Sequence, residues 1–529
     1  METFMKHVLA IALVVAASVA ADSMNGELMA TAAESCAGLA SLKLPSTTIV
    51  LAQRVAAGAF TPPSPYAAGP RGALTLVTPG ELPEFCRVAG IARPSNDSVI
   101  KFEVWMPATN WNGKFLGIGN GGFAGSINYA GMSAGLARQY ATASTDTGHQ
   151  GNGTDPSFAL GHPEKLLDFS YRAVHEMTVH AKSIIAAYYA RAPRFSYWNG
   201  CSLGGRQGLA EAQRFPADFN GIVVGAPANW LTHFQAEGLW NRLAIERNPD
   251  ALVSPSKLAV LHTAVLAACD ARDGVTDGIL EDPTRCDFDP KTIECTGEDR
   301  PDCLTRPQVE LVRQFYDSLI NPRTKKLIYP GYARGGEPVW GDAAKTGHMV
   351  TRSRFGDPGG VFKYLVFQDP SWDYRTFDFD AELARADQLD GGLTSNMDPN
   401  LRPFFARGGK LLQYHGWSDP SPSPLNSVNY YKSVVNLLGG AATVHDSYRL
   451  FMVPGMYHCE DGDGPNTFDS IRAIEQWVEA RQAPDRIIAS HRTDAKVDRT
   501  RPLCPYPQVA SYKGTESTDE AANFACRMP

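Results

Sequence analysis

The chain has 529 residues, more than one compact hydrophobic core usually serves, so we expect either one large domain with a big insertion or two domains. Of these residues, 43% are hydrophobic and 20% are charged, which is the balance of a globular protein. The formal net charge of -7 and the isoelectric point near 6.0 leave no basic surplus, which argues against a nucleic-acid partner.

The N-terminus has the pattern of a secretory signal peptide, predicted over residues 1–21. Lys6 precedes an apolar run at 8–15, and the mostly small residues at 16–21 offer a cleavage site. The apolar run is too short to span a membrane, and no later stretch is long and apolar enough, although an uncleaved anchor is the alternative interpretation. We therefore expect a secreted or periplasmic protein that does not bind a membrane.

Export permits disulfides, because extracytoplasmic compartments are oxidising. The chain has 10 cysteines, an even number, but the sequence alone does not fix how they pair. They are Cys36, Cys86, Cys201, Cys269, Cys286, Cys295, Cys303, Cys459, Cys504 and Cys526.

The first part of the mature chain leads into an alternating pattern of strands and helices. Residues 24–94 show no strong periodicity and are predicted to form an N-terminal extension that packs on the main domain. The core pattern begins with an alternating strand at 98–106, and further strands are predicted at 114–118 and 140–144. A long amphipathic helix is predicted at 169–189, where apolar residues recur at helical spacing.

The alternation of predicted strands and helices continues beyond this helix. A short aromatic strand at 195–198 precedes a helix at 208–215, which Pro216 ends, and a buried strand is predicted at 221–227. Strands that alternate with helices indicate an α/β fold, with a mostly parallel sheet and helices on both faces.

The alternation of strands and helices is interrupted between residues 228 and 406, where the chain has helical segments, acidic clusters and turn-rich loops. We interpret 228–406 as a lid domain inserted over the carboxyl edge of the sheet. The alternation resumes with strands at 409–416 and 448–453 and helices at 425–438 and 468–480. The catalytic domain is therefore predicted in two parts, 22–227 and 407–529.

The sequence Gly200-Cys201-Ser202-Leu203-Gly204 has the G-x-S-x-G pattern of a nucleophile elbow. An elbow is a sharp turn between a strand and a helix that lifts one serine above the sheet, and a strand and a helix are predicted on its two sides. We therefore predict that Ser202 is a catalytic nucleophile. The alternative is a glycine-rich turn with a serine that has no role.

A serine nucleophile needs a base and an acid, which on this kind of fold come later in the chain in the order serine, acid, histidine. Asp419 follows the strand at 409–416, and His458 follows the strand at 448–453. Both positions lie just beyond the carboxyl end of a strand, so we predict a Ser202, Asp419 and His458 triad. A solvated turn aspartate and a packed histidine are the alternatives.

Three other histidines are candidates for a place at or near the predicted triad. His445 and His491 compete for the role of base, but neither directly follows the carboxyl end of a strand. His415 ends its own strand, so a supporting position behind the triad is open to it.

Two cysteines flank the predicted catalytic residues. Cys201 immediately precedes Ser202, and Cys459 immediately follows His458. A disulfide holds two Cα atoms within about 4.4–6.8 Å, so a bridge between these cysteines would place the nucleophile beside its base. Proton transfer between the two side chains needs that proximity.

The developing oxyanion of an acyl-transfer reaction needs two hydrogen-bond donors. We expect one to be the backbone N–H of Leu203, directly after the nucleophile. The other is expected from the glycine-rich loop after the strand at 114–118, at Gly121 or Gly122. A plain glycine turn is the alternative interpretation of this loop.

The segment 269–279 resembles a calcium-binding loop. Asp270, Asp273 and Asp277 offer carboxylate oxygens, and the backbone carbonyls of Val275 and Ile279 can join them in the flexible arrangement that Ca²⁺ prefers. The spacing is not that of an EF-hand, and an acidic surface turn is the alternative. A position within the lid favours a structural ion over a catalytic one.

These motifs together resemble the tannase and feruloyl esterase family. The resemblance rests on residues 200–205, 416–419 and 457–459 and on the loop at 269–279, and it covers nearly the whole mature chain. It implies an α/β-hydrolase core with a large lid that holds a calcium ion, and Ser202, Asp419 and His458 as the triad.

The resemblance also implies a ligand set and a disulfide pattern. The implied calcium ligands are Asp270, Asp273, Val275, Asp277 and Ile279, with Val275 and Ile279 binding through backbone carbonyls. The implied disulfides are Cys201–Cys459, Cys36–Cys86, Cys269–Cys286, Cys295–Cys303 and Cys504–Cys526.

The predicted function is that of a secreted serine esterase. It would hydrolyse feruloyl, hydroxycinnamoyl or galloyl esters through an acyl-enzyme on Ser202, with a small aromatic ester as substrate, free or attached to plant polysaccharide or polyphenol. Alternatives are a hydrolase of other aromatic monoesters such as mono(2-hydroxyethyl) terephthalate, a peptidase of the same fold, or a calcium-dependent binding protein on an inactive scaffold. The intact triad argues against the last.

Specificity is expected to depend on the lid. Six lid aromatics are candidates for a wall that stacks on an aromatic acyl group, although we expect most of them to form the lid's own core. They are Phe362, Tyr364, Phe367, Trp372, Tyr374 and Phe377.

Overall fold

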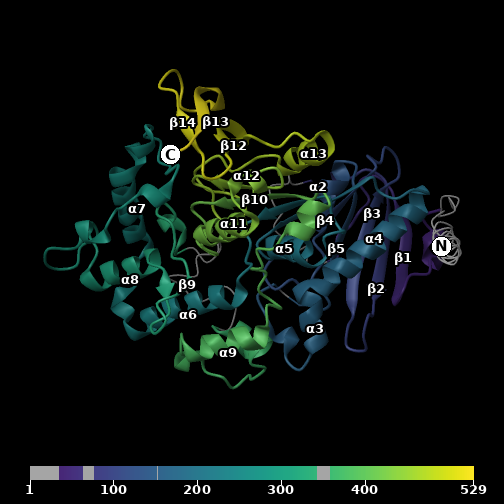
Figure 1. Ribbon diagram of the computed structural model, residues 1–529, viewed down its shortest axis with the longest axis horizontal. Coiled ribbons are helices and arrows are strands. Elements are labelled where there is room, and N and C mark those ends of the chain that lie inside the picture. Colours follow the sequence, from purple (N-terminus) through teal and green to yellow (C-terminus); the bar gives the residue numbers. More distant parts are fainter. Residues whose placement is uncertain (1–34, 64–76, 152, 342–357) are drawn as a thin grey trace, which may run out of the picture.

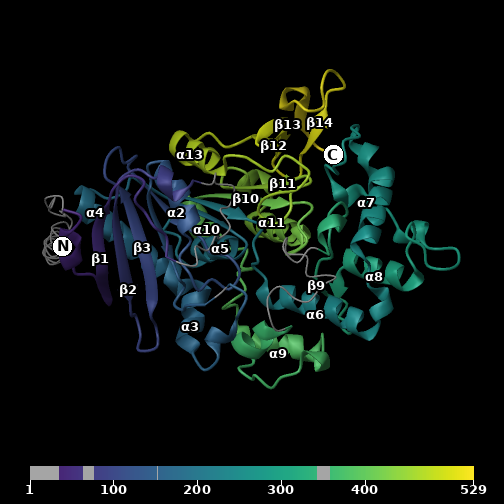
Figure 2. The same cartoon turned by 180° about the vertical axis from the view of Figure 1, so that it is seen from behind.

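The computed structural model describes residues 35–63, 77–151, 153–341 and 358–529. The predicted signal peptide lies outside these ranges. The antiparallel strands of the central sheet lie at one end of the molecule, and the helices Pro255–Cys269 and Arg306–Tyr316 of the 228–406 segment lie at the other (Figures 1 and 2). Within the described ranges, no helix combines the length and the hydrophobicity needed to cross a membrane.

A central sheet of nine strands organises the fold, in the order β1-β2-β3-β5-β4-β6-β7-β10-β11. The strands β1 to β3 and β5 pair antiparallel, and all the neighbours from β5 to β11 pair parallel. The strands are β1 Thr47–Val55, β2 Phe85–Ala92, β3 Ile100–Pro107, β4 Lys114–Ile118, β5 Ala141–Thr145, β6 Phe195–Cys201, β7 Gly221–Gly225, β10 Lys410–Gly416 and β11 Tyr448–Val453. The predicted mostly parallel sheet is therefore confirmed.

Both faces of the parallel part of the sheet are buried, whereas the edge strand β1 keeps several exposed residues. In β4, for example, Phe115 belongs to one hydrophobic cluster and Leu116 to another, as the pleat of a strand requires. One face is covered by α4 Ala173–Tyr189, α5 Leu203–Arg214 and α11 Pro424–Leu438, and the other by α2 Tyr129–Ala137 and α13 Ser470–Ala480. Two short helices, α3 Pro163–Leu167 and α12 Ala441–Val444, complete the core.

The structure differs from the sequence prediction at three places in this core. The extension at 24–94 contributes the strands β1 and β2, which the sequence analysis did not assign. The predicted helix at 169–189 begins with a π-helical turn, Asp168–Arg172. Helix α5 begins at Leu203, not at 208, because the elbow turns directly into a glycine-rich first turn that helix propensity does not favour.

The described residues of the 228–406 segment are largely helical. They form one hydrophobic cluster of their own and share a second with the hydrolase core. Its elements are α6 Leu231–Arg247, α7 Pro255–Cys269, α8 Arg306–Tyr316, β8 Leu319–Ile320, β9 Leu327–Tyr329, α9 Ala381–Asp390 and α10 Arg402–Ala406. It contacts the loop after β10, where the Ser423 hydroxyl donates to the Gly331 carbonyl at 2.5 Å and the Ser418 hydroxyl donates to that of Gly335 at 3.2 Å. The exact domain boundaries stay a prediction.

The C-terminal tail forms two antiparallel hairpins beside the lid (Figure 1). Their strands are β12 Ile487–Thr493, β13 Lys496–Leu503, β14 Val509–Tyr512 and β15 Phe524–Arg527. All five disulfides have the pairing that the resemblance implied, namely Cys36–Cys86, Cys201–Cys459, Cys269–Cys286, Cys295–Cys303 and Cys504–Cys526.

Candidate active site

Ser202 lies at the turn between β6 and α5, in the strand–turn–helix context that the motif predicted. Its backbone angles, φ 62° and ψ -120°, are rare for a residue with a side chain and indicate local strain. The backbone N–H of Ser202 donates to the Gly225 carbonyl at 3.0 Å, which helps to hold this conformation. Gly200 is needed here, because a Cβ on it would lie 2.4 Å from the Gly204 carbonyl oxygen.

Asp419 and His458 meet at the carboxyl ends of β10 and β11. His458 Nδ1 lies 2.8 Å from Asp419 Oδ2. Because a carboxylate accepts, Nδ1 is the donor, which leaves Nε2 as the basic nitrogen. The Asp419 carboxylate is fully buried, and the His458 side chain is 13% exposed. Burial alone would raise the pKa of Asp419, but His458 and His415 more than offset it and lower that pKa to about 2.

His415 binds the same carboxylate oxygen from the other side. Its Nε2 lies 3.0 Å from Asp419 Oδ2 and 3.2 Å from the Pro422 carbonyl oxygen. Both partners are acceptors, so Nε2 carries the proton, while Nδ1 lies 2.7 Å from the Ser427 hydroxyl. The Ser421 N–H donates to Asp419 Oδ1 at 2.8 Å. Asp419 is therefore held by donors on both of its oxygens.

Ser202 and His458 line one pocket. The disulfide between Cys201 and Cys459, with a Cα–Cα distance of 5.9 Å, joins the residues next to them. The pocket is largely apolar and combines the hydrolase core with the start of α6. Its lining residues are Gly122, Phe123, Phe169, Ser202, Leu203, Ala228, Leu231, Phe234, Gln235, Ser421, Pro422 and His458.

The structure distinguishes between the residues predicted as oxyanion donors and between the histidines considered for the role of base. Leu203 and Gly122 line the pocket, whereas Gly121 is not among its described lining residues. Gly122 has φ +56°, and a Cβ there would lie 2.1 Å from the Gly153 carbonyl oxygen, so the loop requires glycine. His445 and His491 bind elsewhere, to Arg449 and Asp498 respectively.

The aromatics of the pocket are not the six lid aromatics singled out from the sequence. Among those six, Phe362, Tyr374 and Phe377 are buried in a cluster that joins the lid to the hydrolase core, and the other three pack against it. The pocket instead uses Phe123, Phe169 and Phe234, which come from distant parts of the chain.

The loop at 269–279 folds around Asp270. The N–H groups of Asp277 and Gly278 donate to the Asp270 carboxylate at 3.3 and 3.0 Å, and the Val275 N–H donates to Asp273 Oδ1 at 2.9 Å. The Cys269–Cys286 disulfide brackets the loop. All three aspartates that the sequence predicted as ligands therefore belong to one compact turn.

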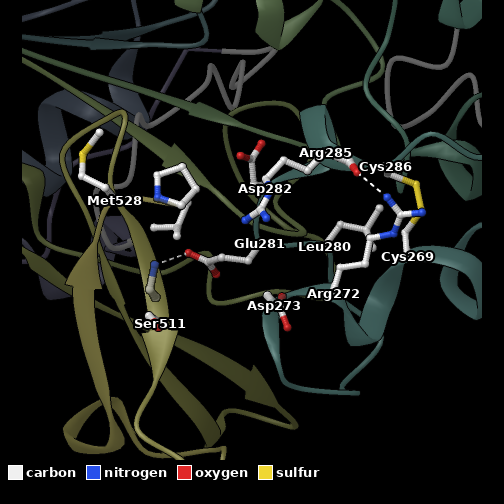
Figure 3. Close-up of a pocket in the computed structure, with 13 residues that line it drawn as sticks. Cys269, Arg272, Asp273, Leu280, Glu281, Asp282, Arg285, Cys286, Ser511 and Met528 are labelled. Atoms are coloured by element: carbon white, nitrogen blue, oxygen red, sulfur yellow. Dashed lines mark hydrogen bonds between the residues drawn. A yellow bond between two sulfur atoms is a disulfide. The ribbon is translucent and has the colours of Figure 1, made fainter.

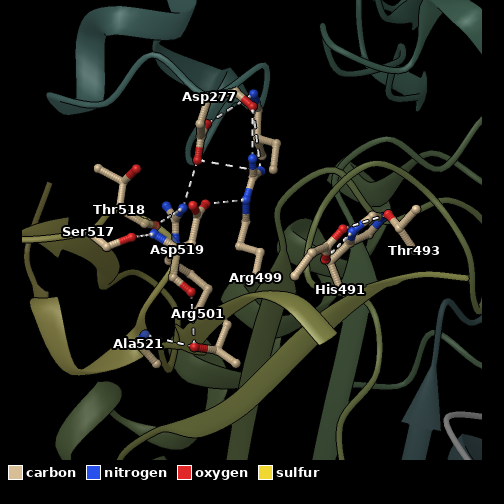
Figure 4. A network of polar contacts seen from close by, with 12 residues as sticks. Asp277, His491, Thr493, Arg499, Arg501, Ser517, Thr518, Asp519 and Ala521 are labelled. Carbon is tan, nitrogen blue, oxygen red and sulfur yellow. Dashed lines mark hydrogen bonds and ion pairs between the residues drawn. The ribbon is translucent and has the colours of Figure 1, made fainter. Parts of the chain in front are cut away.

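The C-terminal hairpins hold this loop from the other side. Arg501 Nη2 lies 2.7 Å from Asp277 Oδ2, and Arg499 approaches the same carboxylate at 3.6 Å (Figure 4). The Ala510 N–H donates to the buried carboxylate of Glu281 at 2.7 Å, beside Asp273 (Figure 3). Glu281 was not among the predicted ligands, since it lies beyond the loop motif.

The loop is crowded with acidic oxygens. Burial, with the charges of Asp277 and Asp270, raises the pKa of Asp273 to about 6, and burial raises that of Glu281 to about 8. Arg501 and Arg499 pair directly with Asp277, and the charge of Arg501 opposes the rise in the pKa of Glu281 without cancelling it. Hard carboxylate oxygens gathered on a turn are the donor chemistry that Ca²⁺ prefers, so the residues present fit a calcium ion.

Comparisons with known proteins agree with this geometry. A model of the family described as "Tannase and feruloyl esterase" matches residues 86–527. An uncharacterized esterase of Xanthomonas campestris is 39% identical over 95% of this chain and 93% of its own length. The mono(2-hydroxyethyl) terephthalate hydrolase of Piscinibacter sakaiensis is 33% identical over 85% of each chain.

Among solved structures, feruloyl esterase B from Aspergillus oryzae is similar, with a TM-score of 0.84 at 29% identity over 93% of this chain and 99% of that one. This similarity confirms the predicted α/β-hydrolase fold.

Proposed function

The chain belongs to the tannase and feruloyl esterase family and is a carboxylic ester hydrolase, and we propose that it cleaves aromatic carboxylate esters through an acyl-enzyme on Ser202. The observation that carries this proposal is the pocket in which a strained elbow serine and the Asp419-bound His458 lie together among aromatic side chains.

The geometry supports a two-step reaction. His458 Nε2 takes the proton from the Ser202 hydroxyl as its oxygen attacks the ester carbonyl, and then gives that proton to the leaving alcohol. Water next attacks the acyl-enzyme as His458 takes its proton; the bond to the Ser202 oxygen then breaks, His458 returns the proton to that oxygen, and the carboxylic acid leaves. Asp419, ionised because the histidines lower its pKa, fixes the imidazole and stabilises its cation.

The oxyanion of each tetrahedral intermediate is assigned to two backbone donors. Leu203 is the first residue of α5, so its N–H is one of those that a helix start leaves without an intrahelical partner. Gly122 supplies the second N–H, in preference to Gly121, because Gly122 lines the pocket.

The apolar wall supports an aromatic acyl group. Phe123, Phe169 and Phe234 offer ring faces and edges, and Leu231 adds aliphatic surface. Gln235 is a neutral polar side chain in the same lining, suited to a hydrogen bond with a ring hydroxyl. We therefore place feruloyl, related hydroxycinnamoyl and galloyl esters first, free or attached to plant polysaccharide or polyphenol.

A second candidate substrate is mono(2-hydroxyethyl) terephthalate. The observation that favours it is the 33% identity to a hydrolase of that ester, which covers most of both chains.

We also propose that the loop at 269–279 holds a structural Ca²⁺ ion. Asp270, Asp273 and Asp277 would bind it through carboxylates, and Val275 and Ile279 through backbone carbonyls. The ion would supply positive charge to a crowded acidic turn, between the lid and the C-terminal hairpins. It has no part in the acyl-transfer steps.

The protein is further proposed to act outside the cytoplasm. Five disulfides are stable in an oxidising compartment, and the sequence at 1–21 is typical of a signal peptide.

The substrate proposal is tested with initial rates on methyl ferulate, methyl gallate and mono(2-hydroxyethyl) terephthalate. Ser202→Ala is the matched control, since it removes one oxygen from the pocket. We expect a clear preference for one of the first two esters, abolished in the control. A preference for the terephthalate ester selects the second candidate, and activity on none of the three contradicts the substrate proposal.

A further inference from the structure

A second cluster of ionisable side chains lies under the helices that cover one face of the sheet, apart from the catalytic pocket. His175 comes from α4, Glu211 from α5 and Asp218 from the loop before β7. Their potential ligand atoms all lie within 4.8 Å of one another. Neither the ester chemistry nor the calcium loop uses these residues.

Glu211 is the feature of this cluster that needs an explanation. The residue is only 1% exposed, and no N–H or hydroxyl group of the described residues donates to either oxygen of its carboxylate. Burial and the adjacent Asp218 carboxylate hold the pKa of Glu211 well above its usual range. Buried carboxyl groups are nearly always hydrogen-bonded, paired with a cation or bound to a metal.

The only side chain that hydrogen-bonds to Glu211 among the described residues is the Asp218 carboxyl group, and that bond requires a proton on one of the two acids. His175 Nδ1 contacts Asp218 Oδ2 at 2.6 Å, and its ring stacks on Phe215 at 3.8 Å between centroids. The Lys182 ammonium donates to the backbone carbonyl of Asp218, so it brings positive charge near the cluster without bonding to Glu211. The two carboxylates therefore face each other with one imidazole beside them.

We propose that His175, Glu211 and Asp218 form a binding site for a divalent transition-metal ion, with Zn²⁺ as the best match. Zinc binds imidazole nitrogen and carboxylate oxygen at about 2.0–2.2 Å, so ligand atoms on opposite sides of the ion are at most roughly 4.4 Å apart. The ligand atoms of the present cluster spread over up to 4.8 Å, so the side chains would have to close by about 0.4 Å to bind the ion.

The donor set also discriminates between metals. One imidazole with two carboxylates suits Zn²⁺ and its first-row neighbours, whereas Ca²⁺ and Mg²⁺ prefer oxygen ligands only. The ion would neutralise both carboxylates and displace the proton that Glu211 otherwise holds. It would link α4, α5 and the loop before β7, and α5 is the helix that begins at the elbow serine. The site is therefore structural, on the opposite end of α5 from the chemistry.

The test uses the full chain, stripped of metal and then saturated with Ca²⁺ so that the loop at 269–279 does not take up zinc. Zn²⁺ is added, excess ion is removed by dialysis, and bound zinc per chain is measured by elemental analysis together with the melting temperature. Co²⁺ in place of Zn²⁺ gives a visible absorption that reports nitrogen and oxygen ligands directly.

Two variants and one control make the result decisive. Glu211→Gln keeps the shape of a protonated glutamate, and His175→Ala removes a partly exposed ring, so at least one should fold even if the other does not. His491→Ala, which removes a surface histidine paired with Asp498, is the matched control.

We expect one Zn²⁺ per chain and a higher melting temperature in the wild type and in the His491→Ala control, with both effects lost in Glu211→Gln and His175→Ala. Equal zinc content in the wild type and in these two variants would overturn the proposal. So would a wild-type chain that retains no zinc, in which case Glu211 and Asp218 share a proton.

Discussion

Removing the Cys201–Cys459 disulfide should damage catalysis more than any other disulfide change. The bridge joins residues 258 apart in sequence, and each cysteine is adjacent to a residue of the proposed triad. Restricting the unfolded chain in a loop of this size contributes about 5.6 kcal/mol in the chain-entropy model, slightly above the range of about 0–5 kcal/mol seen for disulfides. The Cys295–Cys303 bridge spans only 8 residues, for which the same model gives about 2.5 kcal/mol.

We therefore expect the Cys201→Ser/Cys459→Ser variant to lose stability and, separately, turnover. A displacement of the serine from its base by about 1 Å can cost roughly 100-fold in rate, so kcat on folded protein should fall by roughly 10- to 100-fold. The Cys295→Ser/Cys303→Ser variant is the matched control, since it removes a lid bridge and leaves the pocket alone.

The assay measures kcat and KM well below the melting temperature of each variant, with folding checked by circular dichroism. The control should keep the wild-type kcat while its melting temperature falls. If the Cys201→Ser/Cys459→Ser variant is folded and turns over at the wild-type rate, the bridge does not position Ser202 against His458.

Three further predictions follow from the site. His415→Phe keeps a ring but removes the donor to Asp419. A hydrogen bond to a charged group contributes about 1.5–3 kcal/mol, so kcat/KM should fall roughly 10- to 100-fold. The acidic limb of the pH–rate profile should also shift to higher pH. A partial recovery in His415→Gln supports the donor role, and unchanged kinetics in His415→Phe refute it. The pKa of Asp419 is lowered to about 2 in the fold, so its ionised form contributes stability that is present above the ordinary aspartate pKa and is lost as the pH falls towards 2. Acid titrations of unfolding should show this contribution in the wild type and not in Asp419→Asn, and equal pH dependence in both would contradict the assignment. Chelation should lower the melting temperature more than the turnover of protein that is still folded, and an immediate loss of turnover without unfolding would indicate a catalytic metal instead.

The catalytic motifs were accessible from the sequence because each is local. The parallel strands are short apolar runs, and β4 and β11 have the predicted bounds. On such a sheet the carboxyl ends of the strands share one edge, so Ser202, Asp419 and His458 could be placed near one another from their positions after strands alone. The double adjacency of Cys201 and Cys459 added a constraint between two distant motifs.

The remaining features depend on contacts between distant segments. Strands β1 and β2 exist because they pair with each other and with β3, and nothing local in the extension indicates that pairing. Phe123, Phe169 and Phe234 form one wall only after the lid has folded over the core. Sequence patterns carry no such information.

The polar contacts behind the site are equally non-local. The sequence indicates only that His415 lies near the triad. Its hydrogen bond to Asp419 Oδ2, the oxygen that His458 also contacts, depends on the conformation of the loop after β10. Glu281 joins the acidic loop because the C-terminal hairpin holds it there.

The central claim is that Ser202 is the nucleophile, and one measurement tests it most directly. The protein is treated with a serine-directed fluorophosphonate, residual ester hydrolysis is followed, and the modified peptide is identified by mass spectrometry. The account predicts one label per chain, on Ser202, with activity lost in proportion to labelling and no label in Ser202→Ala. Labelling at another serine, or full activity after Ser202 is modified, would contradict it.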